Sequence, residues 1–132
     1  MRVTWAILCD YYIRDVQTGN SSLVGVFSRA GFPSFPRTLV SFYLALRFES
    51  EVSDTSGVKD CRVSLVDQDG RELAKGSLTV DLPNVSPENE ISVITAFRFD
   101  MVQFYEAGKH RFDIFIDGVT AGSTSLEIIR TD

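Results

Sequence analysis

The stretch KHRFDIFIDGVTAGSTSLEII, residues 109–129, decides the fold class of this chain. Alternate residues from His110 to Ile116 are aromatic or aliphatic, and they share one face of an extended strand because successive strand side chains point to opposite faces. Asp117 and Gly118 then favour a tight reversal, since glycine adopts positive φ without steric cost. A second β-rich run continues to residue 129. We therefore predict a half-buried antiparallel hairpin.

This hairpin should contain an irregularity. If Asp117 and Gly118 form a two-residue turn, regular pairing exposes Leu126 and Ile128 to water and buries serines instead. A register shift of one residue moves every side chain to the other face, which corrects the pattern. We therefore expect either a three-residue connection or a β-bulge near Gly122, because an interior glycine often marks a bulge.

The composition is that of an ordinary globular protein. The chain has 132 residues, of which 44% are hydrophobic and 23% charged, so it can bury a substantial core in one domain. The net charge of −5 argues against a nucleic-acid partner, whose sites need clustered Lys and Arg. No basic run favours a membrane surface, and no apolar run approaches the roughly 20 residues of a membrane-spanning helix.

Most of the remaining sequence repeats the β-strand alternation, separated by turn residues. The first run, 2–14, is expected to be a strand rather than an export signal, because its apolar stretch is short and Leu8 stands where a small residue is required. The expected strands cover 2–14, 21–27, 39–49, 59–67, 71–82, 90–100, 109–116 and 119–129. About eight strands with turns every 8–12 residues predict an all-β fold, an antiparallel two-sheet β-sandwich that spans residues 1–132 as one domain.

Three features within these runs refine the prediction. Gly25 indicates a close approach or a bulge in its strand. In residues 39–49, Val40 is expected to share a face with Phe42 and the other alternate apolar residues. Residues 90–105 fit a helical stripe as well as a strand, but their β-branched opening favours a strand to about residue 100 and then a short turn.

The stretch 28–38 breaks the alternation, because Pro33 and Pro36 cannot donate hydrogen bonds to a sheet. It carries Phe32 and Phe35, which either cap the core beneath a connection or form an exposed loop that docks on a partner. We favour the cap, since exposed phenylalanine is costly without a partner.

Cys9 and Cys61 are the only cysteines, and each lies in an apolar strand context. We expect two buried, reduced thiols that pack as small hydrophobic groups. A disulfide between strands is possible, but no spacing implies one.

The segments ITAFRFDMVQFYEAGKHRFDIFIDG and WAILCDYYIRD…SLVGVF, with FPSFPR between them, resemble a family of small uncharacterised bacterial proteins, a domain of unknown function. The resemblance covers nearly the whole chain and implies a soluble cytoplasmic sandwich of this length, with no catalytic residues to transfer. Separately, the pattern at 108–118 is similar to the last hairpin of many immunoglobulin-like domains, with His110 at a place where a Tyr often stands. A likeness of fold implies no activity.

The sequence contains no recognisable catalytic or cofactor motif. His110 is the only histidine, Asp113 falls on the opposite face of its strand, and no nucleophile can be placed beside it from spacing. We therefore interpret His110 as a structural side chain and expect neither catalytic residues nor cofactors. One histidine and two separated cysteines make no zinc site, and glycine-rich phosphate loops and nucleophile elbows are absent from the sequence.

Acidic residues at turns give a weak indication of calcium. Asp67, Asp69 and Asp117 lie at expected hairpin tips, and calcium-dependent sandwiches gather Asp from such loops. An Asp-Gly pair at a hairpin tip is first of all a turn signal, so we interpret these residues mainly as turn formers.

We therefore predict a non-catalytic β-sandwich that binds another protein or its own copy. Tyr12, Phe32, Phe35 and Phe115 are the candidate interface residues. Phe115 is the clearest of them, because it shares a strand face with charged residues and must be covered or set in an interface. The alternative is a sandwich that binds calcium or carbohydrate through the loops 50–58, 67–70 and 83–89.

Overall fold

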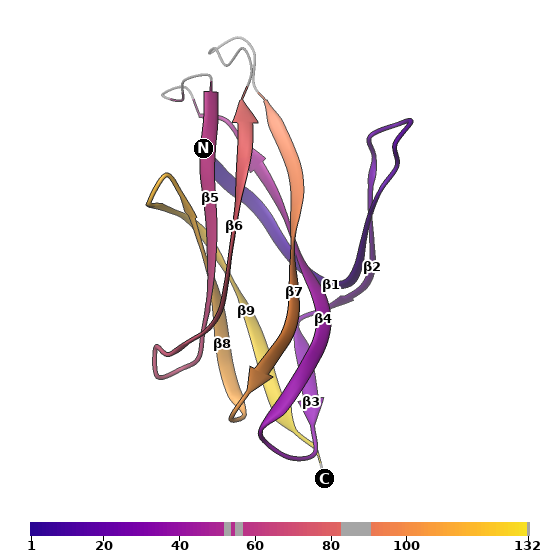
Figure 1. Cartoon of the computed structure of the whole chain (residues 1–132), viewed down its shortest axis with the longest axis vertical. Helices are drawn as coiled ribbons and strands as arrows, with labels where there is room; N and C mark the ends of the chain where they lie inside the picture. Colours follow the sequence, from indigo (N-terminus) through magenta and orange to yellow (C-terminus); the bar gives the residue numbers. More distant parts are fainter. Residues whose placement is uncertain (52–53, 55–56, 83–90, 132) are drawn as a thin grey trace.

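A computed structural model describes residues 1–51, 54, 57–82 and 91–131. These residues form two packed β-sheets and no helix (Figure 1). The strands are β1 (Arg2–Arg14), β2 (Ser21–Phe27), β3 (Arg29–Phe32), β4 (Arg37–Glu49), β5 (Gly57–Val66), β6 (Glu72–Leu82), β7 (Ser92–Phe104), β8 (Gly108–Ile116) and β9 (Val119–Arg130). One sheet has the order β2-β1-β4-β7 and the other the order β3-β9-β8-β5-β6.

The strand order is that of an immunoglobulin-like sandwich. In that fold, strands B and E are neighbours in one sheet, and G, F, C and C′ form the other. Here β4 lies beside β7, and β9-β8-β5-β6 supply the second sheet in the corresponding chain order. The predicted antiparallel sandwich is therefore confirmed, with nine strands in place of about eight.

The extra strand lies in the stretch that the sequence marked as irregular. β3 (Arg29–Phe32) pairs in parallel with the end of β9. Phe32 is only 7% exposed, and its ring lies 6.0 Å from those of Phe35 and Phe104. The predicted cap over the core is therefore confirmed.

The core lies between the two sheets and is rich in phenylalanine. The rings of Phe42 and Phe99 stack at 5.3 Å, and Phe112 from the opposite sheet meets Phe99 edge-on at 5.5 Å. Offset and edge-to-face contacts of this kind add to the stabilisation that burial gives. Cys9 and Cys61 are buried as free thiols, as predicted, and burial raises the pKa of Cys61 to about 12.

The hairpin β8–β9 has the predicted bulge. Asp117 and Gly118 both have positive φ, and Ile116 pairs with Val119 across this two-residue turn. The register then shifts so that Phe115 pairs with Thr120 but Ile114 pairs with Gly122. The residue between Thr120 and Gly122 has no partner on β8, so the rest of β9 returns its apolar side chains to the inward face. Leu126 and Ile128 are buried as a result. Gly122 also allows close packing, because a Cβ there would lie 2.9 Å from Cβ of Val3.

On β4 and β7 the alternation of inward and outward side chains is interrupted at the same level of the sheet, which the sequence did not indicate. The two strands keep one register along their length, yet the inward residues change from Phe42 to Leu39 on β4. Val40 and Met101, which lie opposite each other at this point, are 68% and 66% exposed, and Met101 has a φ of 54°. The expectation that Val40 points inward is therefore wrong. So is the turn after residue 100, because β7 continues to Phe104.

The hairpin formed by β1 and β2 leaves the body of the sandwich. β1 pairs with β4 only from Arg2 to Cys9, whereas β2 pairs with β1 from Leu8 to Arg14. Residues 10–25 consequently stand away from the other strands as a two-stranded ribbon, which we call the arm (Figure 1). At its base Gly25 has a φ of 69°, and the carboxylate of Asp10 occupies the place that a Cβ of Gly25 would need.

Candidate interaction surface

His110 is a core residue. Its side chain is fully buried, its ring meets Phe104 edge-on at 5.2 Å, and Nδ1 lies 3.0 Å from the carbonyl oxygen of Gly108. Within the described residues Nε2 has no hydrogen-bond partner. Asp113 is on the opposite face, where it accepts a hydrogen bond from Arg111 at 2.7 Å. This geometry matches the structural role that the sequence predicted for His110, and it separates His110 from Asp113.

Three carboxylates meet where β5 turns into β6. Asp67, Asp69 and Glu106 each place one oxygen within 4.8 Å of the others. Oδ1 of Asp67 accepts hydrogen bonds of 2.9 Å from the backbone N–H groups of Asp69 and Arg71, and Oδ2 lies 3.2 Å from Nε of Arg71. Those hydrogen bonds, led by that from the Arg71 backbone, hold the pKa of Asp67 below its usual range. Asp67 therefore serves the turn itself.

Glu106 was not among the predicted metal residues. A hydrogen bond with Asp69, burial and repulsion from Asp69 and Asp67 raise the pKa of Glu106. Asp117 lies at the other end of β8, where its Oδ1 accepts a hydrogen bond of 2.9 Å from the backbone N–H of Asp60. The structure thus brings together two of the three predicted acidic residues and adds Glu106 from a distant turn. Their oxygens are of the kind that calcium prefers, but those of Asp67 already accept three hydrogen bonds.

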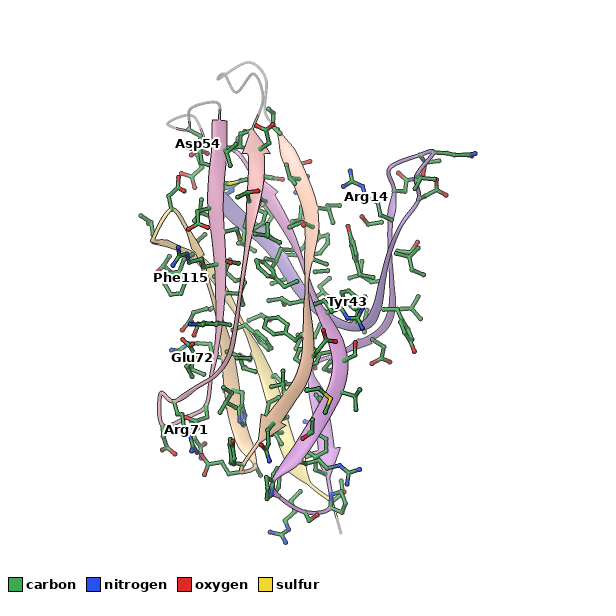
Figure 2. The ribbon with its side chains drawn as sticks, viewed as in Figure 1. Arg14, Tyr43, Asp54, Arg71, Glu72 and Phe115 are labelled. Carbon is green, nitrogen blue, oxygen red and sulfur yellow. The ribbon has the colours of Figure 1, made fainter. Side chains whose placement is uncertain are left out.

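The four predicted interface residues occupy different places. Phe32 is buried in the core, so its assignment to an interface is corrected. Phe35 is half-buried against Phe32. Phe115 is half-buried on the outer face of its sheet (Figure 2). It lies directly opposite Arg62 on β5. Tyr12 lies on the arm, where its hydroxyl is 2.8 Å from Oγ of Ser21.

The arm exposes more apolar surface than the sequence suggested. On the arm the exposed fractions are 64% for Tyr11, 55% for Ile13 and 48% for Val24, and Val26, directly after the arm, is 62% exposed. Tyr11 and Val24 are direct cross-strand neighbours, so their exposed side chains are adjacent. Alternation alone could not show this, because the residues become exposed only where β1 leaves β4. Gly25, within the strand-like run 21–27, was the feature of the sequence that pointed to an irregularity here.

The free edge of the arm is unprotected. β2 is the outermost strand of its sheet, and its sequence, SSLVGVF, contains neither a charged residue nor a proline. Natural edge strands usually carry such residues, because they prevent pairing with other chains. β6, an edge strand of the other sheet, has Glu72, Lys75 and Asp81. The contrast marks β2 as an edge that is open to pairing.

Two opposite charges flank this edge. Arg14 pairs with Ser21 near the tip of the arm, and Asp10 lies over Gly25 at its base. Neither side chain makes an ion pair or a hydrogen bond to any other residue that the structure describes. In Figure 2 Arg14 lies on the side of the arm that faces β4 and β7, and Tyr43 lies near the base of the arm.

Comparisons with known proteins identify a family but no activity. The model of a family of unknown function (DUF6941) matches residues 4–129. No curated protein matches the chain significantly. In the part of the chain that the structure describes, no helix is long and apolar enough to cross a membrane.

Two solved structures share a partial likeness. One is an alkylpurine DNA glycosylase, AlkC, from Pseudomonas fluorescens, bound to DNA with an abasic site analogue. It has 14% identity and a TM-score of 0.41 over 77% of this chain and 28% of that one. The other is an immunoglobulin-like protein, PA1606, from Pseudomonas aeruginosa. It has 12% identity and a TM-score of 0.37 over 96% of this chain and 94% of that one. No function transfers to this chain at these similarities.

Proposed function

This chain belongs to a family of unknown function (DUF6941), and we propose from its own surface that it is a non-catalytic module that binds protein through the β1–β2 arm. The observation that carries the proposal is the exposed apolar surface of the arm. Tyr11, Ile13 and Val24 on the arm, and Val26 directly after it, are all about half exposed or more. Full burial of an apolar side chain of this size contributes about 1.5–3 kcal/mol. Because these side chains are about half exposed, a partner gains roughly half of that free energy for each one that it covers.

The isolated position of the arm supports the same proposal. A two-stranded hairpin is marginally stable in water at best, because it buries little apolar surface. Residues 10–25 are such a hairpin beyond the point where β1 leaves β4. A partner strand or surface on the arm would supply the missing cover. The unpaired edge of β2 offers that partner backbone hydrogen bonds as well.

The alternative function, binding of calcium or carbohydrate through the loops, has less support. Of its loops, 67–70 contributes two carboxylates to the group with Glu106. The loop 83–89 lies outside the described residues, as do residues 52–53 and 55–56 of the loop 50–58. Calorimetric titration with calcium tests this alternative, and a binding heat that disappears in Glu106→Gln would favour it over the arm.

Site-specific photo-crosslinking in the native host tests the proposed function. A photoreactive amino acid at Val24 should give a discrete covalent adduct with a protein, since this side chain lies on the exposed arm. The matched control places the same group at Thr79, an exposed residue of β6, whose strand carries protective charges. Absence of an adduct at position 24, or an equal adduct at position 79, would overturn the proposal.

A further inference from the structure

We propose that the partner of the arm is a second copy of this chain, with the two β2 strands paired antiparallel about a twofold axis. This inference rests on the proposed function and specifies its partner. In such a dimer each arm would add two strands to the other, so that the pair becomes a four-stranded sheet. The backbone groups on the free edge of Ser21–Phe27 would then gain hydrogen-bond partners.

The sequence of the edge suits pairing with itself. A twofold interface uses one surface patch on both copies, so the patch must be complementary to itself. β2 has no charged residue, and like charges therefore do not meet where one β2 lies beside the other. The adjacent Tyr11 and Val24 would lie beside the same pair on the second copy, which covers part of their exposed apolar surface.

The two charges beside the edge also become complementary. Antiparallel pairing places the tip of each arm beside the base of the other. Arg14, near the tip, can extend over the small Ser21 opposite it, and the carboxylate of Asp10 already lies over Gly25 at the base. Each interface would therefore hold two Arg14–Asp10 pairs between copies. These attractions oppose the general repulsion between two chains of net charge −5.

Charge reversal on the arm tests this arrangement by sedimentation equilibrium. The wild-type chain should dimerise, whereas Asp10→Arg and Arg14→Asp should each self-associate about tenfold more weakly, because like charges then meet twice at the interface. An equimolar mixture of the two variants should recover the wild-type affinity, since each positive arm then faces a negative one. Asp81→Arg and Lys75→Asp make the same changes of charge on β6 and should leave dimerisation unchanged.

Two results would overturn the inference. The first is a wild-type chain that stays monomeric at all concentrations. The second is a mixture that associates no more tightly than either variant alone. The proposed function is judged separately by the adduct at Val24. An adduct with a different protein retains the binding function and rejects self-pairing, an adduct of twice the chain mass supports both, and no adduct rejects the proposed function itself.

Discussion

At the scale of single residues, His110 determines how well the core is packed at the start of β8. His110→Ala should lower the free energy of unfolding by about 3 kcal/mol, because it leaves a cavity beside Phe104. His110→Phe should lower it by about 1 kcal/mol or less. The contact with Phe104 is kept, and the loss of the contact between Nδ1 and the Gly108 carbonyl oxygen is offset by removal of Nε2, which has no partner among the described residues. Urea denaturation measures both. If Phe destabilises the chain as much as Ala, the imidazole has a polar role.

Glu106 gives a prediction about pH. Because its pKa is raised in the folded chain, the folded state holds this proton more firmly than the unfolded state. Stability should fall as the pH rises through the unfolded and then the folded pKa, and the ionised carboxylate remains unfavourable above both. Glu106→Gln should therefore be more stable than wild type at pH 7, and its advantage should shrink as the solution is acidified.

Melting temperatures measured between pH 3 and 8 check this expectation for Glu106. Asp81→Asn, which removes an exposed carboxylate of β6, is the matched control and should show no such trend. A Glu106→Gln variant that is less stable than wild type at pH 7 would contradict the account of the three carboxylates.

At the scale of strands, regular alternation could be predicted and its interruptions only partly. The β8–β9 bulge was predictable, because regular pairing across the two-residue turn could not place the apolar residues of both strands on the same face of the sheet. The switch at Val40 and Met101 was not, because both strands change face together and no register conflict appears in either sequence. β3 was missed because four residues pair with distant β9, an interaction that local sequence does not encode.

The candidate interaction surface could likewise be predicted from the sequence only in part. The arm follows from two features that the sequence contains, Gly25 within a β-run and the uncharged edge SSLVGVF. Their meaning depends on where β1 leaves β4, which only the folded chain shows. Glu106 joins Asp67 and Asp69 from a separate turn, so residue spacing could not group them. From the sequence Phe32 could belong to a cap over the core or to an exposed loop, and the structure buries it as the favoured cap requires.

At the scale of the whole molecule, the arm is an addition to a sandwich that is complete without it. The core residues lie on β4 to β9, with β3 and the first half of β1. Residues 10–25 extend beyond this core, and none of them belongs to it. The core of the sandwich therefore does not depend on residues of the arm, which are left for the proposed association (Figure 1).

The most direct measurement of this division compares the apparent sizes of two chains in extracts of the native host. In the second chain Asn-Gly replaces residues 10–25 and joins Cys9 to Val26, which are already paired. We expect the wild-type chain to elute in a larger species. The shortened chain, shown to be folded by its circular-dichroism spectrum, should elute as a monomer. A wild-type monomer, or a shortened chain that remains in the larger species, would contradict the proposed association through the arm.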